Sequence, residues 1–163
     1  MIKQNKIQEL INHSGCFDLQ FRKDVRHERT NSPTYYRWKA QFVIATPKKE
    51  FKSLKKIMEI FGCGSISLEK NQVRFSVQKI DDISEKIIPF FRKSQLFGNK
   101  KKDFELWKKA VDIIYDNKGK NILKWKKNDL LSLMQIHKSI AKYKNKPRQG
   151  KWIEMAKSMA KTI

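Results

Sequence analysis

The sequence is short of acidic residues and cysteines, and it has no long apolar run. Only 16 aspartates and glutamates stand against 37 lysines and arginines in the 163 residues. No run reaches the roughly 18 apolar residues that a membrane-spanning helix needs, and the first residues lack the apolar core of a signal peptide. The two cysteines, Cys16 and Cys63, form neither a disulfide framework nor a zinc-ligand pattern. We therefore expect no membrane partner and no disulfide-stabilised domain.

The same imbalance gives the chain a net charge of +21 at pH 7. Such an excess of positive charge favours a polyanionic partner, and nucleic acid is a better candidate than a membrane surface. The alternative is a lysine-rich surface that serves only solubility.

Motifs of common enzymes are also missing. There is no Gly-rich phosphate loop, no Ser/His/Asp pattern and no GxSxG sequence. The three histidines, His13, His27 and His137, lack the spacing of metal ligands. No cofactor is predicted.

Hydrophobic periodicity divides the chain into helices and strands. We expect strands at 16–25, 35–46, 64–68 and 73–78, and helices at 3–14, from Pro47 to Gly62, and at 80–92, 102–115, 129–143 and 151–161. Pro89 should bend or interrupt the helix at 80–92. Two hairpins separated by a helix predict an α+β fold of the αββαββα type, with a four-stranded antiparallel sheet and C-terminal helices. Residues 1–116 would form the core and 117–163 a basic helical extension.

One face of this sheet is apolar, and the other collects polar side chains. Arginine and lysine neutralise phosphates, and arginine and glutamine also contact base edges. An ordinary solvated sheet face is the alternative. The predicted nucleic-acid-binding residues on the strands are Gln20, Arg22, Arg37, Lys39, Gln41, Arg74 and Gln78.

The C-terminal third adds further cations with aromatic residues between them, namely Trp125, Tyr143 and Trp152. Cations paired with stacking aromatics suit irregular or single-stranded RNA, although these aromatics could equally pack inward. The predicted binding residues outside the sheet are Lys100, Lys101, Lys124, Lys126, Lys127, Lys142, Lys144, Lys146 and Arg148.

Four segments resemble the single-motif LAGLIDADG homing endonuclease family, over about residues 7–143. They are IQELINHSGCF at 7–17, FVI at 42–44, LKKIMEIFGCGSI at 54–66 and KKKDFELWK at 100–108. The block after Lys127, which ends in residues 144–148, is also similar to the family's C-terminal helix and basic tail. The resemblance implies two signature helices that pack together, each ending in an acidic residue that holds a divalent metal for phosphodiester cleavage. It also implies sheets that lie over the DNA major groove.

The chain departs from that pattern where the metal would bind. Ser14 stands at the position of the metal-binding acid, and magnesium prefers carboxylate and phosphate oxygens to a hydroxyl. Gln8, Glu9 and His13 replace small residues that let signature helices touch, so the usual homodimer is doubtful. Thr46 stands where the family often has glutamine. We therefore predict no catalytic residue and no metal site.

Other carboxylates could in principle rebuild a metal site. Glu9, Asp18 and Asp24 are the candidates, although each is more simply a charge partner for nearby lysines. An enzyme, if there is one, would be a magnesium-dependent DNA endonuclease.

These features predict a catalytically inactive, LAGLIDADG-like protein that binds structured RNA. It would be a ribosome component, bound to rRNA and next to ribosomal proteins, or an intron-splicing cofactor. The alternative is a DNA-binding homing endonuclease or its inactive relic. The abundance of Lys, Asn and Ile is typical of an AT-rich genome, which with the family suggests an organelle, a mitochondrion or a plastid.

Overall fold

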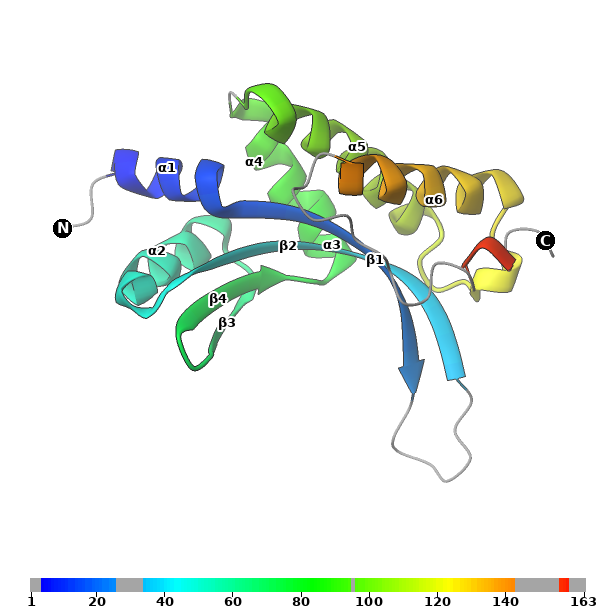
Figure 1. The fold of residues 1–163 in the computed structure, drawn as a ribbon, viewed down its shortest axis with the longest axis horizontal. Coiled ribbons are helices and arrows are strands. Elements are labelled where there is room, and N and C mark those ends of the chain that lie inside the picture. Colours follow the sequence, from blue (N-terminus) through cyan, green and yellow to red (C-terminus); the bar gives the residue numbers. More distant parts are fainter. Residues whose placement is uncertain (1–3, 26–33, 95, 143–155, 159–163) are drawn as a thin grey trace. The chain divides into compact units, whose positions relative to one another are not determined.

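The structure is a computed structural model, and it describes residues 4–25, 34–94, 96–142 and 156–158. Figure 1 shows the elements in chain order. They are α1 (Gln4–Ser14), β1 (Gly15–Val25), β2 (Thr34–Pro47), η1 (Lys48–Glu50), α2 (Phe51–Phe61), β3 (Ser65–Leu68), β4 (Gln72–Val77), α3 (Ile80–Asp82), η2 (Ile83–Ile87), α4 (Ile88–Lys93), α5 (Gly98–Asp116), η3 (Ile122–Lys124) and α6 (Lys127–Lys142). Most of the helix predicted at 151–161 lies outside the described residues.

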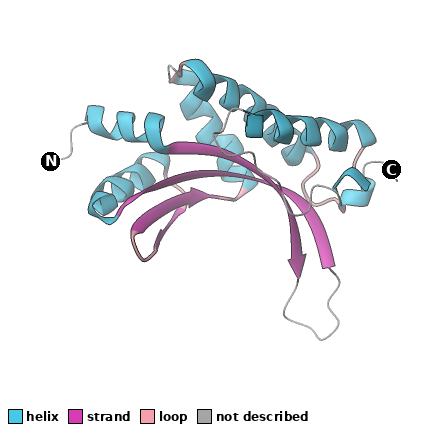
Figure 2. Ribbon diagram, viewed as in Figure 1, coloured by secondary structure: helices cyan, strands magenta, loops and turns pink. Residues whose placement is uncertain are grey.

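The four strands, coloured magenta in Figure 2, form one sheet. Their order in the sheet is β1-β2-β4-β3. β4 pairs antiparallel with both β2 and β3. The predicted α+β fold with a four-stranded antiparallel sheet is therefore confirmed, and the strand ends agree with the prediction to within one residue. None of the helices in the described ranges has the length and apolar character needed to cross a membrane.

The chain divides into two compact units. The first unit comprises residues 1–18 and 41–104, and the second comprises residues 19–40 and 105–163. Because β1, β2 and α5 each contribute to both, neither unit is a continuous stretch of sequence. The boundary at residues 116 and 117 that we predict from composition stays a prediction.

Aromatic side chains form the core of the first unit. Phe42 and Phe75, on neighbouring strands, are fully buried. The Phe61 ring of α2 stacks on Phe75 with centroids 6.0 Å apart, and the Phe91 ring of α4 meets Phe17 edge-on at 4.9 Å. Gly64 completes this packing, because a Cβ there would lie 2.5 Å from the Phe75 ring and its φ is +93°. The helices of this unit thus cover the apolar side of its strands.

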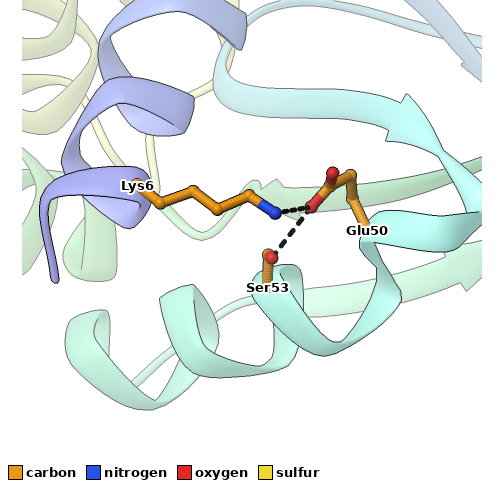
Figure 3. A network of polar contacts seen from close by, with 3 residues as sticks. All are labelled: Lys6, Glu50 and Ser53. Atoms are coloured by element: carbon orange, nitrogen blue, oxygen red, sulfur yellow. Dashed lines mark hydrogen bonds and ion pairs between the residues drawn. The ribbon is translucent and has the colours of Figure 1, made fainter. Parts of the chain in front are cut away.

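A polar network joins α1 to the start of α2 (Figure 3). Lys6 Nζ lies 3.5 Å from Glu50 Oε2, and Ser53 Oγ donates a hydrogen bond of 2.9 Å to the same oxygen. Ser53 is buried, whereas the Lys6 side chain is 59% exposed. The Ser53 hydrogen bond is therefore the better-shielded half of the network.

The helix predicted at 80–92 is interrupted as Pro89 suggests. Ile83 to Ile87 form a π-helical turn, in which the Ile88 amide bonds the carbonyl of Ile83, five residues back. Pro89 has no amide hydrogen to continue the α-helical ladder, so a change of hydrogen-bonding pattern just before it costs little. The helix resumes as α4.

The second unit packs its strand segments and helices around tryptophans. The Trp38 ring lies 5.2 Å from Phe21 and 6.0 Å from His137 of α6, and Trp107 of α5 is fully buried. Asn117, just after α5, donates from Nδ2 to the Ile113 carbonyl at 2.8 Å and to Asp129 Oδ2 at 3.1 Å. That amide therefore fixes the end of α5 to the first turn of α6.

Candidate nucleic-acid interface

Helix α1 passes into strand β1 without a loop. Ser14 is the last residue of the helix and Gly15 the first of the strand. A side chain at Gly15 would overlap the Ile11 carbonyl and touch the Phe42 ring at 3.0 Å, so the turn admits only glycine. Lys100 Nζ donates a hydrogen bond to the Gly15 carbonyl. The junction therefore has Ser14 next in sequence to a glycine whose carbonyl oxygen accepts a hydrogen bond from an ammonium group.

This junction does not fit the divalent metal that the family resemblance implies. Ser14 supplies a neutral hydroxyl, and Lys100 places a positive charge on the adjacent carbonyl oxygen. Both features oppose the binding of Mg²⁺, which prefers anionic oxygen ligands. Within the described ranges, no three His, Cys, Asp or Glu side chains are grouped so that they could hold a metal ion.

The solvent side of α1 carries large polar side chains. Gln8 Nε2 donates to Asn12 Oδ1 at 3.2 Å, one helical turn along. Glu9 and His13 are both exposed. The helix surface that the resemblance implies for helix pairing is thus polar and bulky in this chain.

The first unit has a sheet surface on the side opposite its aromatic core, which we call the outer face. Its register is well defined, because Arg74 of β4 pairs with Ala45 of β2 and with Ser67 of β3. Ser76 pairs in the same way with Val43 and Ser65. The outer face therefore consists of Val43, Ala45, Pro47, Ser65, Ser67, Gln72, Arg74 and Ser76, and Val43 among them is buried. Ala45, Ser65 and Ser67 are exposed, and Arg74 and Ser76 are half-buried.

Gln41 departs from the predicted exposure. It is 4% exposed and donates from Nε2 to Asp18 Oδ2 at 2.7 Å, and Asp18 is 2% exposed. The prediction that Gln41 lies on an exposed binding face is wrong for this reason, because its amide is engaged by a buried carboxylate. The same burial removes Asp18 from the surface charges.

The remaining predicted residues fall into three groups. Arg22, Arg37, Gln78, Lys101, Lys124, Lys126 and Lys127 are exposed. Gln20, Lys39 and Lys100 are half-buried. Lys142 ends α6 without a described side chain, and Lys144, Lys146 and Arg148 lie outside the described residues. The exposed cations of this set therefore lie on the strands of the second unit, around η3 and, at Lys101, on α5.

The Trp125 side chain is not available to stack on an RNA base. It is 6% exposed, and its indole Nε1 donates to the Lys120 carbonyl at 3.2 Å. Among the three aromatic residues of the basic C-terminal third, the structure describes Trp125, and this side chain packs inward. Tyr143 and Trp152 lie outside them.

Sequence reasoning missed two features of the surface. A lysine stripe of Lys48, Lys49, Lys52, Lys55 and Lys56 is exposed on η1 and α2, and the run KKEFKSLKK with its amphipathic spacing could have predicted it. The small residues around Arg74 carried no such signal, because only the pairing register brings Ala45 and Ser67 beside it.

The fold and the interface together define an αββαββα domain whose sheet offers polar side chains on one face. The model that describes the LAGLIDADG endonuclease family matches residues 10–111. This chain belongs to the LAGLIDADG endonuclease family, as its resemblance in sequence predicts.

Two curated relatives come from Neurospora crassa. Probable intron-encoded endonuclease 3 is 34% identical over 103 residues, which are 62% of this chain and 19% of that protein. Probable intron-encoded endonuclease 2 is 37% identical over 76 residues, which are 45% of this chain and 17% of that protein. The matched part of this chain therefore spans about a fifth of the length of these relatives.

Solved structures share the fold at low sequence identity. I-SmaMI bound to an uncleaved DNA target in the presence of calcium ions has a TM-score of 0.74 at 20% identity, over 96% of this chain and 49% of that one. The homing endonuclease I-TnaI has a TM-score of 0.68 at 17% identity, over 99% and 97%. I-AabMI bound to uncleaved DNA has a TM-score of 0.64 at 24% identity, over 85% and 44%.

Proposed function

We propose that this chain binds duplex DNA through the polar side of its strands and does not cleave it with its own α1–β1 junction. The observation that carries the proposal is the outer face, where the half-buried Arg74 lies between the small, exposed residues Ala45 and Ser67. Chains of the same fold, I-SmaMI and I-AabMI, have been solved with DNA bound. The net charge of +21 supplies the electrostatic attraction that any phosphate backbone requires.

The absence of cutting is proposed from the chemistry of the junction. Water activation by a divalent metal needs anionic ligands that hold the ion beside the scissile phosphate. Ser14 and the Lys100 ammonium at the Gly15 carbonyl provide the opposite environment. The chain's own residues therefore support binding and orientation of a polynucleotide, and no bond-breaking step.

Structured RNA, which the sequence favours, takes second place here. Its support is the set of aromatic residues between the C-terminal cations, and Trp125 among them is buried and hydrogen-bonded within the chain. RNA binding, including a place in a ribosome or on an intron, remains the main competing outcome of the experiment below.

The experiment compares the affinities of the 163-residue chain for partners of equal length and charge at one fixed salt concentration. Labelled random-sequence duplex DNA, duplex RNA and a structured RNA hairpin are titrated with and without Mg²⁺. We expect duplex DNA to bind more tightly than either RNA, with or without Mg²⁺, and to stay uncut. Tighter binding of either RNA would overturn the proposal in favour of the RNA function.

A matched pair of variants tests the surface. Arg22→Ala with Arg74→Ala removes two charges from the strands, and Lys52→Ala with Lys55→Ala removes two from the outside of α2. The strand variant should weaken duplex binding by about 1–3 kcal/mol for each arginine that binds a base edge. An equal weakening by both variants would mean that only overall charge matters.

Two further parts of the proposal concern the oligomeric state and the location in the cell. The large polar residues on α1 should leave the chain monomeric, which light scattering over a range of concentrations would test. An organellar location is proposed from composition, and both relatives are named as intron-encoded. Fractionation of the source cells would test it.

A further inference from the structure

Strand β3 forms one edge of the four-stranded sheet (Figure 1). It pairs with β4 on one side, and among the described residues no strand pairs with its other side. Where the β3–β4 hairpin turns, the Glu69 amide donates to the Gln72 carbonyl at 2.9 Å. This bond sets the phase of the ladder, because bonded and non-bonded pairs alternate along antiparallel strands. The pair of Ser67 with Arg74, two residues further on, is therefore a bonded one.

Ile66 and Leu68 lie in the non-bonded pairs, so their backbone groups point away from β4. Each residue has one N–H donor and one C=O acceptor. Within the described ranges, neither makes a hydrogen bond to a loop, a helix or a side chain. We call Ile66 and Leu68 with these backbone groups the β3 edge. It offers two donors and two acceptors in strand register, as an added β-strand requires.

The apolar covering of the sheet ends one strand before this edge. Val73 of β4 is fully buried, whereas Leu68, its direct partner on β3, is 65% exposed. Directly paired residues point to the same side of a sheet. Because α2 contacts both strands, Leu68 lies on the side that carries α2 but outside the area that this helix covers. An apolar side chain on an added strand would cover it.

Exposed lysines gather at the end of the sheet where Leu68 lies. Pro47, the last residue of β2, pairs with Gln72, the first residue of β4. Helix η1 and the turn between β3 and β4 therefore lie at the same end of the sheet. The exposed lysines of η1, of the first turn of α2 and of this turn are Lys48, Lys49, Lys52 and Lys70.

The charge of these four lysines is not balanced within the chain. Among the described residues, none of the four makes a hydrogen bond or an ion pair. The nearby Glu50 carboxylate is held by Lys6 and Ser53, and the Glu69 carboxylate accepts a hydrogen bond from Gln72. An excess of positive charge remains beside the β3 edge even when Glu69 is counted.

We propose that the β3 edge binds an extended segment of another, acidic polypeptide as an added strand of the sheet. Apolar side chains of that segment lie against Leu68, and carboxylates beyond the end of its strand meet Lys70 and the lysines of η1. The backbone donors and acceptors of the edge match a polypeptide backbone, which a nucleic acid lacks.

Charge complementarity favours this occupant over a second copy of the chain. Two chains of net charge +21 repel each other, and lysines beside an edge strand discourage pairing between like edges. The inference goes beyond polynucleotide binding and does not rest on it, because the β3 edge and the outer face are different surfaces.

The test titrates the full chain with a fluorescent synthetic peptide in which a run of glutamates precedes alternating valines and threonines. We expect saturable binding that weakens as salt is raised, because part of the attraction is between charges. Amide hydrogen exchange locates the site. Exchange at Ile66 and Leu68 should slow on binding, whereas the Ser67 amide, which the ladder already bonds to β4, should change little. Unchanged exchange at Ile66 and Leu68 would overturn the proposal.

A second peptide separates strand addition from simple attraction between charges. It has the same side chains, but the amides of its valines and threonines are N-methylated, so it cannot pair as a strand. We expect it to bind about tenfold more weakly or worse, because the backbone hydrogen bonds are lost. Equal binding of the two peptides would overturn the proposal. This comparison uses the unchanged chain and so does not depend on the folding of any variant.

Variants of the edge test the same point from the side of the protein. Leu68→Pro removes an N–H that points away from β4, so the ladder with β4 keeps its bonds while strand addition is blocked. It should weaken peptide binding by about tenfold or more. Leu68→Ala should weaken binding less, and Leu123→Ala, at a residue of η3 that is 59% exposed, should have no effect. Equal effects of the two alanine variants would contradict the inference.

A matched pair of double variants tests the lysines. Lys48→Ala with Lys70→Ala should weaken peptide binding more than Lys109→Ala with Lys138→Ala, which removes two exposed charges from α5 and α6. Equal weakening would mean that only overall charge matters and would overturn the proposal.

Light scattering tests the competing occupant of the edge. The unchanged chain should not associate through β3. Self-association that Leu68→Pro abolishes would assign the β3 edge to a second copy of the chain and overturn the acidic partner.

Discussion

Gln41 donates a hydrogen bond of 2.7 Å from its side-chain amide to the carboxylate of Asp18, and both side chains are almost completely buried. A buried carboxylate depends on such donors, because desolvation disfavours its charge. We expect Gln41→Leu to lower the free energy of unfolding by about 1–3 kcal/mol, since Asp18 loses a donor. Urea unfolding at neutral pH measures the change.

The control for this prediction is Asp18→Asn. In the double variant Gln41→Leu with Asp18→Asn, no buried charge remains, so the destabilisation should be smaller than the sum of the two single effects. Strict additivity of the two changes would mean that the hydrogen bond contributes nothing to stability.

The network at the start of α2 predicts two unequal effects. Ser53→Ala removes a partly buried hydrogen bond to Glu50 and should cost about 1–2 kcal/mol. Lys6→Ala removes an exposed ion pair at 3.5 Å and should cost at most about 0.5 kcal/mol. Thermal unfolding of both variants tests the order, and a larger destabilisation by Lys6→Ala would contradict it.

The sequence predicts the sheet well because its strands alternate strictly. Phe17, Leu19 and Phe21 alternate with polar residues, and this period of two places each side chain on one face. The interruption before Pro89 follows from a missing amide in the same direct way. Local chemistry is sufficient for both.

Exposure could not be predicted in the same way. Alternation assigns Asp18 and Gln41 to the polar face, but their burial depends on a cross-strand partner 23 residues away. The surroundings of Arg74 likewise depend on strand register, which joins residues 45, 67 and 74. Periodicity gives the face of a side chain, and tertiary packing decides whether that face is open.

The environment of the Cys63 thiol leads us to expect that the free energy of unfolding decreases at alkaline pH. Burial, followed by the negative charge of Asp82, raises the pKa of the Cys63 thiol above its ordinary value of 9.0, although Lys86 acts in the opposite direction. Above pH 9.0 the unfolded chain therefore releases this proton while the folded chain keeps it, so stability falls as pH rises. Below that pH the thiol is neutral in both states and contributes no slope.

The measurement is the difference in unfolding free energy between the unchanged chain and Cys63→Ala across pH. The difference should be constant below pH 9.0 and then shift against the unchanged chain above it. Because lysines and tyrosines titrate equally in both proteins, their contributions cancel in the difference. A difference that stays flat through the alkaline range would contradict the prediction.

Ser14→Asp should not by itself create a nuclease. The change supplies one carboxylate at the end of α1, but the Lys100 ammonium still occupies the Gly15 carbonyl next to it. The new carboxylate lies close enough along the chain to attract that ammonium, which competes with a divalent cation for the same oxygens.

We expect no cleavage of supercoiled DNA by Ser14→Asp in Mg²⁺, at protein concentrations that saturate binding. Ser14→Ala serves as the matched variant without a carboxylate, and the two should bind DNA with similar affinity. Magnesium-dependent cutting by Ser14→Asp, absent in Ser14→Ala, would show that the junction needs only its acid to hold the metal, and that Lys100 does not oppose it.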